Sequence, residues 1–153
     1  AMIATRVNDI ETEDCATISF VMSSGALASS SITLGAAGDE TRIRFVFEHL
    51  TATSGSAPYA PGSQPWTFTA RDENLQSKID QAVAATPFEA VGFQGFFTEV
   101  ALAIAGEPNH SVRLQDGAIS IALVTALYHS ARTGQRVALQ LRPDHELYKG
   151  WLP

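Results

Sequence analysis

Residues 92–141 place the narrowest limits on the fold, because two helical patterns there are separated by a loop and followed by a glycine. The first pattern has the i, i+3, i+4, i+7 spacing of one apolar helix face. Its members are Phe93, Phe96, Phe97, Val100, Ala101 and Ile104. Gly106 and Pro108 follow, and they are typical of a helix end. We therefore predict an amphipathic helix that ends just before Gly106.

The second pattern covers residues 119–131 and is apolar around most of its circumference, which is typical of a buried helix. Asp116 is the expected N-cap, and Gly134 is the expected left-handed stop. Residues 137–141 then alternate with a period of two and predict a strand. We expect residues 92–141 to form the packing centre on which a sheet rests.

The preceding part of the chain predicts that sheet. Alternation over residues 16–22 and 26–34, with a turn at residues 23–25, predicts a hairpin. A long third strand is expected over residues 41–53 and a short fourth one over residues 66–70. Asp72 is the expected cap of a further helix.

Strands followed by helices indicate an α+β domain with an open, mostly antiparallel sheet. We expect helices packed on one face of this sheet and the other face uncovered. The prediction is one domain over residues 1–153, with a lead-in over residues 1–12 and an irregular tail over residues 143–153.

Composition excludes several classes of function. The formal net charge of -6 and the absence of a Lys/Arg cluster argue against binding to nucleic acid or to an anionic membrane. One cysteine excludes an internal disulfide and a Cys-rich zinc site. No run of 18 apolar residues and no signal-peptide pattern is present, so we expect a cytoplasmic protein.

The uncovered face is the first candidate site. Small hydroxyl side chains and one arginine are expected on it, and they are Thr17, Ser19, Ser29, Ser31, Thr33 and Arg42. This surface is either solvated, packed against another sheet, or the floor of a ligand site. We predict that it mediates homo-oligomer formation.

Four other residues are candidate substrate contacts. Arg44 and Glu48 lie four residues apart and are predicted on the same outward face of one strand. The alternative is that they form a surface ion pair, which would contribute little to the stability of the fold. Tyr59 lies in a proline-rich loop over residues 54–65 and Trp66 follows it, and each either caps the core or stacks on a ligand.

No catalytic or metal-binding residue is predicted. The four histidines are scattered with no i, i+4 pair, and no nucleophile elbow or phosphate loop is present. The paired acids Glu13–Asp14 and Asp39–Glu40 are interpreted as solvated turn charges.

Four runs of sequence carry a resemblance to a known family, and they are Gly92–Phe97, Ala103–Pro108, Asp116–Gly117 and Leu123–Gly134. They resemble the C-terminal domain of the glucose-fructose oxidoreductase/inositol dehydrogenase (Gfo/Idh/MocA) family, and the helix pair that ends in Ser130–Gly134 is the most specific part. The hairpin around Ser24–Leu27 and the pair Glu13–Asp14 are similar to the first strands of that domain. Together these matches cover most of residues 13–142.

The resemblance implies an N-terminal Rossmann domain that binds NAD or NADP and a substrate that is a sugar, a polyol or a related hydroxyl compound. The C-terminal sheet would supply part of the substrate wall and the oligomer interface. The family's dinucleotide fingerprint and catalytic residues have no counterpart in this sequence, so we expect no cofactor and no activity in this chain alone. The alternative is a free-standing binding or dimerisation module with the same fold and no catalytic activity.

Overall fold

The computed structural model describes residues 1–87, 90–139 and 143–148. Its elements are β1 (Met2–Ala4), β2 (Cys15–Val21), β3 (Leu27–Thr33), β4 (Arg44–Val46), β5 (Leu50–Thr53), the 3-10 helix η1 (Pro61–Ser63), β6 (Thr67–Ala70), α1 (Glu73–Ala85), α2 (Gly92–Ala105) and α3 (Leu114–Thr133). The predicted α+β class with antiparallel strands is confirmed, with the strands in two three-stranded sheets.

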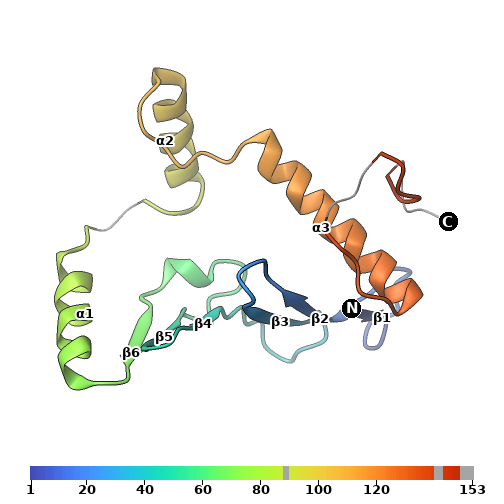
Figure 1. The fold of residues 1–153 in the computed structure, drawn as a ribbon, viewed down its shortest axis with the longest axis horizontal. Helices are drawn as coiled ribbons and strands as arrows, with labels where there is room; N and C mark the ends of the chain where they lie inside the picture. The colour runs from blue at the N-terminus through green and yellow to red at the C-terminus, as the bar shows by residue number, and fades with distance from the viewer. Residues whose placement is uncertain (88–89, 140–142, 149–153) are drawn as a thin grey trace. The chain divides into compact units, whose positions relative to one another are not determined.

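The chain divides into two compact units. The first unit comprises residues 1–37 and 112–153, and the second comprises residues 38–111. The colours of Figure 1 follow residue number, so the first unit is drawn in blue and in orange to red, and the second mainly in green and yellow. The expectation of one domain over residues 1–153 stays a prediction.

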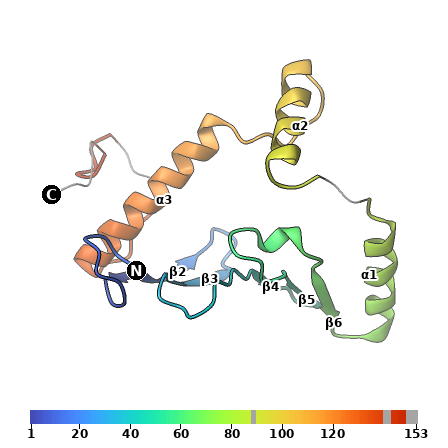
Figure 2. The same ribbon diagram turned by 180° about the vertical axis from the view of Figure 1, so that it is seen from behind.

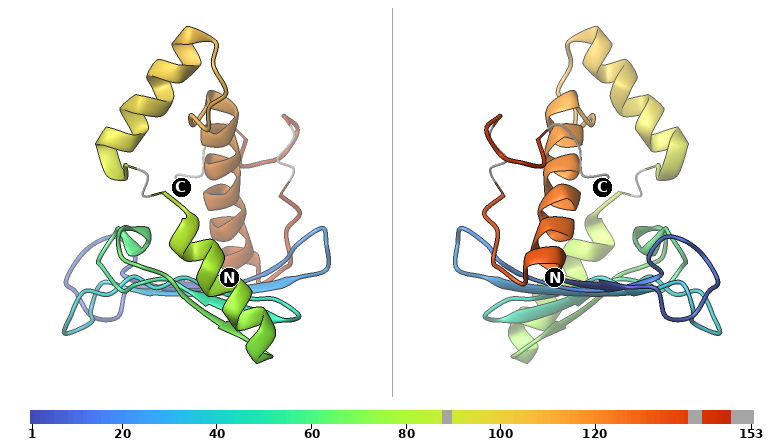
Figure 3. Two further views of the ribbon diagram at one scale, coloured as in Figure 1. Left: turned by 90° about the vertical axis from the view of Figure 1, so that its left-hand side faces the viewer. Right: turned by 90° about the vertical axis from the view of Figure 1, so that its right-hand side faces the viewer.

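The first unit is the sheet β1-β2-β3 with α3 on one side of it (Figure 3). Ile18 is 8% exposed and Ala126 of α3 is also buried, so the small apolar core of this unit involves β2 and α3. Residues 2–4 pair with residues 15–17, so the predicted lead-in in fact begins with a strand. Gly134 has φ 68 and ends α3 in the left-handed conformation, as predicted.

Two details of the first unit differ from the sequence-based expectation. Asp116 is the third residue of α3 and not its N-cap, and its carboxylate accepts a hydrogen bond from the Arg113 N–H at 2.8 Å. Residues 137–139 are not a strand. The remainder of that predicted strand, and residues 149–153 of the predicted tail, lie outside the described residues.

The second unit contains the sheet β4-β5-β6 followed by α1 and α2. The long strand predicted over residues 41–53 is a hairpin, because the chain reverses at Glu48–His49 and the Phe47 N–H donates to the Leu50 carbonyl at 2.8 Å. Neither turn residue is glycine or asparagine, and the alternation of apolar residues continues into the turn, so no local signal marks the reversal.

The packing centre predicted over residues 92–141 is wrong for α2, whereas α3 has Thr125 and Ala126 buried. No residue of α2 is buried, and Phe93 and Ile104 are 82% and 84% exposed. The helix itself is present, and Gly106 ends it in the left-handed conformation as predicted. The apolar spacing therefore predicted the helix but not its burial.

A side-chain amide connects α1 to the open edge of β6. Figure 2 shows α1 following directly from the end of that strand. Gln76 donates to the Phe68 carbonyl at 3.1 Å and accepts from the Ala70 N–H at 2.8 Å. The amide of Gln76 thus pairs with the strand as a neighbouring backbone would, which protects this edge from pairing with other chains.

We predict that Gln76→Ala destabilises the second unit by about 1–3 kcal/mol, because the Phe68 and Ala70 backbone groups lose their partners. Gln81→Ala is the matched control, since Gln81 is an exposed residue of the same helix with the same intrinsic propensity. Urea denaturation of both variants checks this. Equal midpoints for the two variants would show that the amide pairing contributes nothing.

Candidate functional site

The hydroxyl face of the first sheet is the strongest candidate site. We use this name for Thr17, Ser19, Ser29, Ser31 and Thr33. The register of β2 and β3 places Thr17 opposite Ser31 and Ser19 opposite Ser29. All five residues are exposed. The strand pairing thus places these five side chains on one face of the first sheet.

Exposed apolar residues border the hydroxyl face. Val21 is opposite Leu27 at the hairpin end, and these residues are 52% and 81% exposed. Met2 of β1 is the partner of Thr17 in the register and is also exposed. Because directly opposed side chains lie about 5 Å apart in an antiparallel pair, the surface combines a flat floor of hydroxyls with apolar groups at its margins.

Arg42 lies elsewhere. It precedes β4 in the second unit and pairs with Glu40 at 3.0 Å, with both side chains more than half exposed. An exposed ion pair of this kind contributes little to stability. Arg42 therefore belongs to the second unit and is not a residue of the first sheet.

The second sheet has a threonine-rich face that sequence reasoning missed in part. The register places Arg44 opposite Thr53, and Thr53 opposite Thr67. Thr51 and Thr69 are likewise opposite each other and on the same face. Sequence reasoning missed the hairpin within residues 41–53. Because these residues were predicted as one strand, the side chains of β5 could not be assigned to a face of the sheet.

The four predicted substrate contacts do not converge. Arg44 is on the threonine-rich face, whereas Trp66 precedes β6 and stacks on Phe45 with ring centroids 5.9 Å apart. Phe45 is opposite the buried Ala52, so Trp66 lies on the apolar face of the sheet, beside the half-exposed Phe45. Glu48 is in the turn after β4, so the prediction that it shares a strand face with Arg44 is wrong.

Tyr59 belongs to an ordered loop. Its N–H donates to Thr41 Oγ1 at 3.1 Å, which holds it near the beginning of β4, away from the turn that carries Glu48. Its φ of 60° is unusual for a residue with a side chain, and the residue is 85% exposed. The surrounding contacts hold a strained conformation that presents this ring to solvent.

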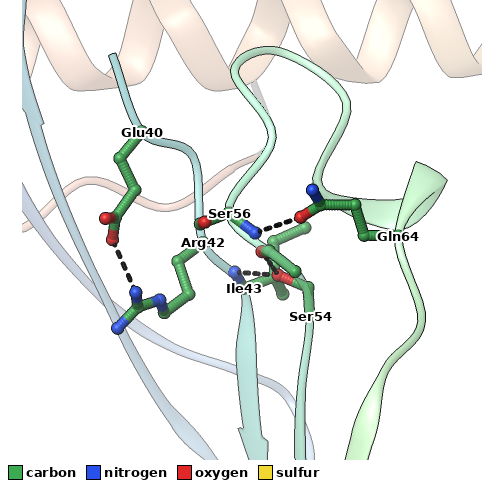
Figure 4. A network of polar contacts seen from close by, with 7 residues as sticks. Glu40, Arg42, Ile43, Ser54, Ser56 and Gln64 are labelled. Carbon is green, nitrogen blue, oxygen red and sulfur yellow. Dashed lines mark hydrogen bonds and ion pairs between the residues drawn. The ribbon is translucent and has the colours of Figure 1, made fainter. Parts of the chain in front are cut away.

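Polar contacts explain why residues 54–65 are ordered (Figure 4). Ser54 Oγ accepts from the Ile43 N–H at 2.8 Å and donates to the Gly55 carbonyl at 2.7 Å. Gln64 Oε1 accepts from the Ser56 N–H at 2.9 Å and so closes the loop on itself. Gly55 is required there, because an added Cβ would lie 2.4 Å from Gln64 Cβ.

Asp14 has the clearest pKa shift among the described residues, and its interpretation as a solvated turn charge is wrong. It is 2% exposed and accepts from the backbone N–H groups of Arg6, Val7 and Asn8 at 2.7–2.9 Å. The Asn8 N–H holds the pKa of the Asp14 carboxyl well below its ordinary range, burial opposes this, and the other two N–H groups add to it. Neighbouring Glu13 accepts a hydrogen bond from the Tyr128 hydroxyl of α3.

Two of the scattered histidines meet in the first unit. The rings of His129 and His145 have centroids 5.0 Å apart, and His129 Nδ1 lies 3.0 Å from Glu146 Oε1. His145 Nδ1 also accepts the Leu147 N–H at 3.1 Å. These contacts hold residues 145–147 against the end of α3.

The described residues were also compared with the requirements of a metal site and of a membrane-spanning helix. Among residues 1–87, 90–139 and 143–148, no group of three or more His, Cys, Asp or Glu side chains is placed to hold a metal ion. Within the same ranges, no helix combines the length and apolar character needed to cross a membrane. No family model, curated protein or solved structure matches the chain.

Proposed function

We propose that this chain is a non-catalytic association domain, specifically the C-terminal substrate-side and oligomerisation domain of an NAD(P)-dependent oxidoreductase of the Gfo/Idh/MocA type. The observation that carries the association role is the hydroxyl face. Its five small side chains are exposed, four of them are opposed in register as two pairs, and exposed apolar residues lie at its margin. Small side chains allow two sheets to approach closely, and a two-fold axis would place the same surface against itself.

The exposed surface of the chain supports the need for a partner. The accessible surface is 12325 Å². Size scaling gives roughly 9000 Å² for two separate folded bodies of half this mass. The excess includes large apolar side chains of α2 and of the first hairpin, such as Phe93, Phe97 and Leu27. A surface of this composition is stabilised when another protein surface covers it.

The oxidoreductase assignment rests on the sequence resemblance. In this proposal an N-terminal Rossmann domain binds NAD or NADP and holds the catalytic groups, and the substrate is a sugar, a polyol or a related hydroxyl compound. The two hydroxyl-rich sheet faces, with Arg44 on one of them, are suited to hydrogen bonding with such a substrate.

Thermal denaturation with NAD and with NADP tests the proposal. We expect no saturable rise in Tm with either nucleotide, because this chain supplies only the substrate side. A dinucleotide site filled at a hundred times its Kd would raise the free energy of unfolding by about 2.7 kcal/mol, which is easily detected. ATP is the control for nonspecific polyanion effects. Stabilisation by NAD or NADP but not by ATP would contradict the proposal.

A further inference from the structure

The first unit contains a cavity of about 930 Å³ between the end of β2, the second half of α3 and residues 134–139. Its walls are mainly apolar and include Phe20, Met22, Leu123, Leu127, Val137 and Leu139. Small-molecule sites in proteins have volumes of roughly 300–1,000 Å³ and mostly apolar linings. The cavity therefore has the size and composition of a ligand site.

Two cationic groups lie in this apolar lining, the Arg136 guanidinium and the Ala1 ammonium group, which donates a hydrogen bond to Ser130 Oγ at 2.8 Å. Arg136 is the only ionisable side chain that lines the cavity, and no ion pair engages its exposed guanidinium within the described part of the chain. Ser23, Ser130 and Gln135 add hydrogen-bonding groups to the lining.

We propose that this cavity binds an amphipathic monocarboxylate, with its aliphatic chain between β2 and α3 and its carboxylate on Arg136. The planar guanidinium offers two parallel N–H donors that match the two carboxylate oxygens. The apolar walls remove the aliphatic chain from water, which is the main source of affinity. Charge complementarity thus selects an anionic ligand over a neutral apolar one of the same length.

Calorimetric titration with decanoate and with 1-decanol tests this assignment. We expect saturable 1:1 binding of decanoate and weaker binding of 1-decanol. Arg136→Gln should weaken decanoate binding about tenfold, the effect of losing one charge-assisted interaction, and should leave 1-decanol unchanged. Arg6→Gln is the matched control, because Arg6 is an exposed arginine of the same unit that does not line the cavity.

A second variant locates the binding site. Ala138 is an exposed residue of the cavity lining, so Ala138→Phe should fill the cavity without disturbing the core and should abolish binding of both compounds. Methyl NMR shifts induced by decanoate should be confined to residues such as Leu123, Leu127 and Val137. The proposal is overturned if decanoate fails to bind, if it binds Arg136→Gln as tightly as the parent chain, or if its shifts fall on α2.

Discussion

Replacement of Asp14 by asparagine should release the loop between β1 and β2 and remove a large part of the acid sensitivity of the first unit. The carboxylate accepts three consecutive backbone N–H groups, from Arg6, Val7 and Asn8, and the Asn8 side-chain amide. Asparagine has one oxygen for this cluster and directs an NH₂ group at the remaining donors. Backbone donors left without a partner in a buried position are costly, so the loop should open.

The sign of the pH dependence follows from the lowered pKa of Asp14. A carboxyl whose pKa is lower in the folded state stabilises the fold fully above its unfolded pKa of about 3.9, and this contribution is lost as the pH falls below that value. The parent chain should therefore lose stability steeply between about pH 5 and pH 2. The Asp14→Asn variant should show a much flatter profile and a lower stability at pH 7.

Hydrogen exchange and thermal denaturation against pH measure the two effects. At pH 7 the amides of residues 6–8 should exchange roughly ten times faster or more in Asp14→Asn than in the parent chain. Asp9→Asn is the matched control, because Asp9 is an exposed aspartate of the same loop. A pH profile of Asp14→Asn that is parallel to the parent profile would show that this carboxylate does not govern the acid response.

The helices could be predicted because their signals are local. Asp72 accepts from the Leu75 N–H at 2.8 Å and caps α1, and Gly106 and Gly134 adopt positive φ at the ends of α2 and α3. Each of these effects involves residues within one helical turn. Asp116 shows how far such local signals determine a helix boundary, because an aspartate can serve either as the N-cap or as the third residue of a helix.

Burial was less predictable, since it depends on what covers a surface. The stripe of α2 has core spacing, but Phe93 and Phe97 are exposed. The turn at Glu48–His49 also lacks the residues that usually mark a hairpin, so the strand order of the second sheet could not be derived. Without that hairpin, the faces carrying Arg44 and Trp66 could not be distinguished.

Some features of the candidate site could likewise be predicted from the sequence, and others could not. The hydroxyl face follows from strict alternation in β2 and β3, which fixes the face of every residue once the hairpin is placed. The role of Asp14 could not be inferred, because its partners are backbone N–H groups that any residue type provides. The contact between His129 and His145 depends on how residues 143–148 lie against α3, which spacing along the chain does not determine.

The double variant Ser29→Glu, Ser31→Glu should convert an assembled particle into a smaller one. Ser29 and Ser31 are adjacent on the hydroxyl face, opposite Ser19 and Thr17. A symmetric contact through this face would bring four new carboxylates together in each pair of subunits, in a protein that already has a net charge of -6. Like charges held in a contact without partners cost several kcal/mol, which is enough to dissociate most interfaces.

Light scattering coupled to size exclusion measures the particle mass, and circular dichroism checks that the fold is unchanged. The control Ser24→Glu, Ala26→Glu adds the same two charges to exposed residues in the turn of the same hairpin, outside the hydroxyl face, and should retain the parent mass. A parent chain that is already monomeric, or a Ser29/Ser31 variant of unchanged mass, would contradict the proposal that the hydroxyl face is the contact surface. If both double variants dissociate, the loss of assembly follows from the added net charge and does not identify the contact surface.

The neutral double variant Ser29→Leu, Ser31→Leu then decides whether the hydroxyl face is the contact surface. Bulky neutral side chains separate two closely packed sheets without adding charge, so a smaller particle would again assign the contact to this face.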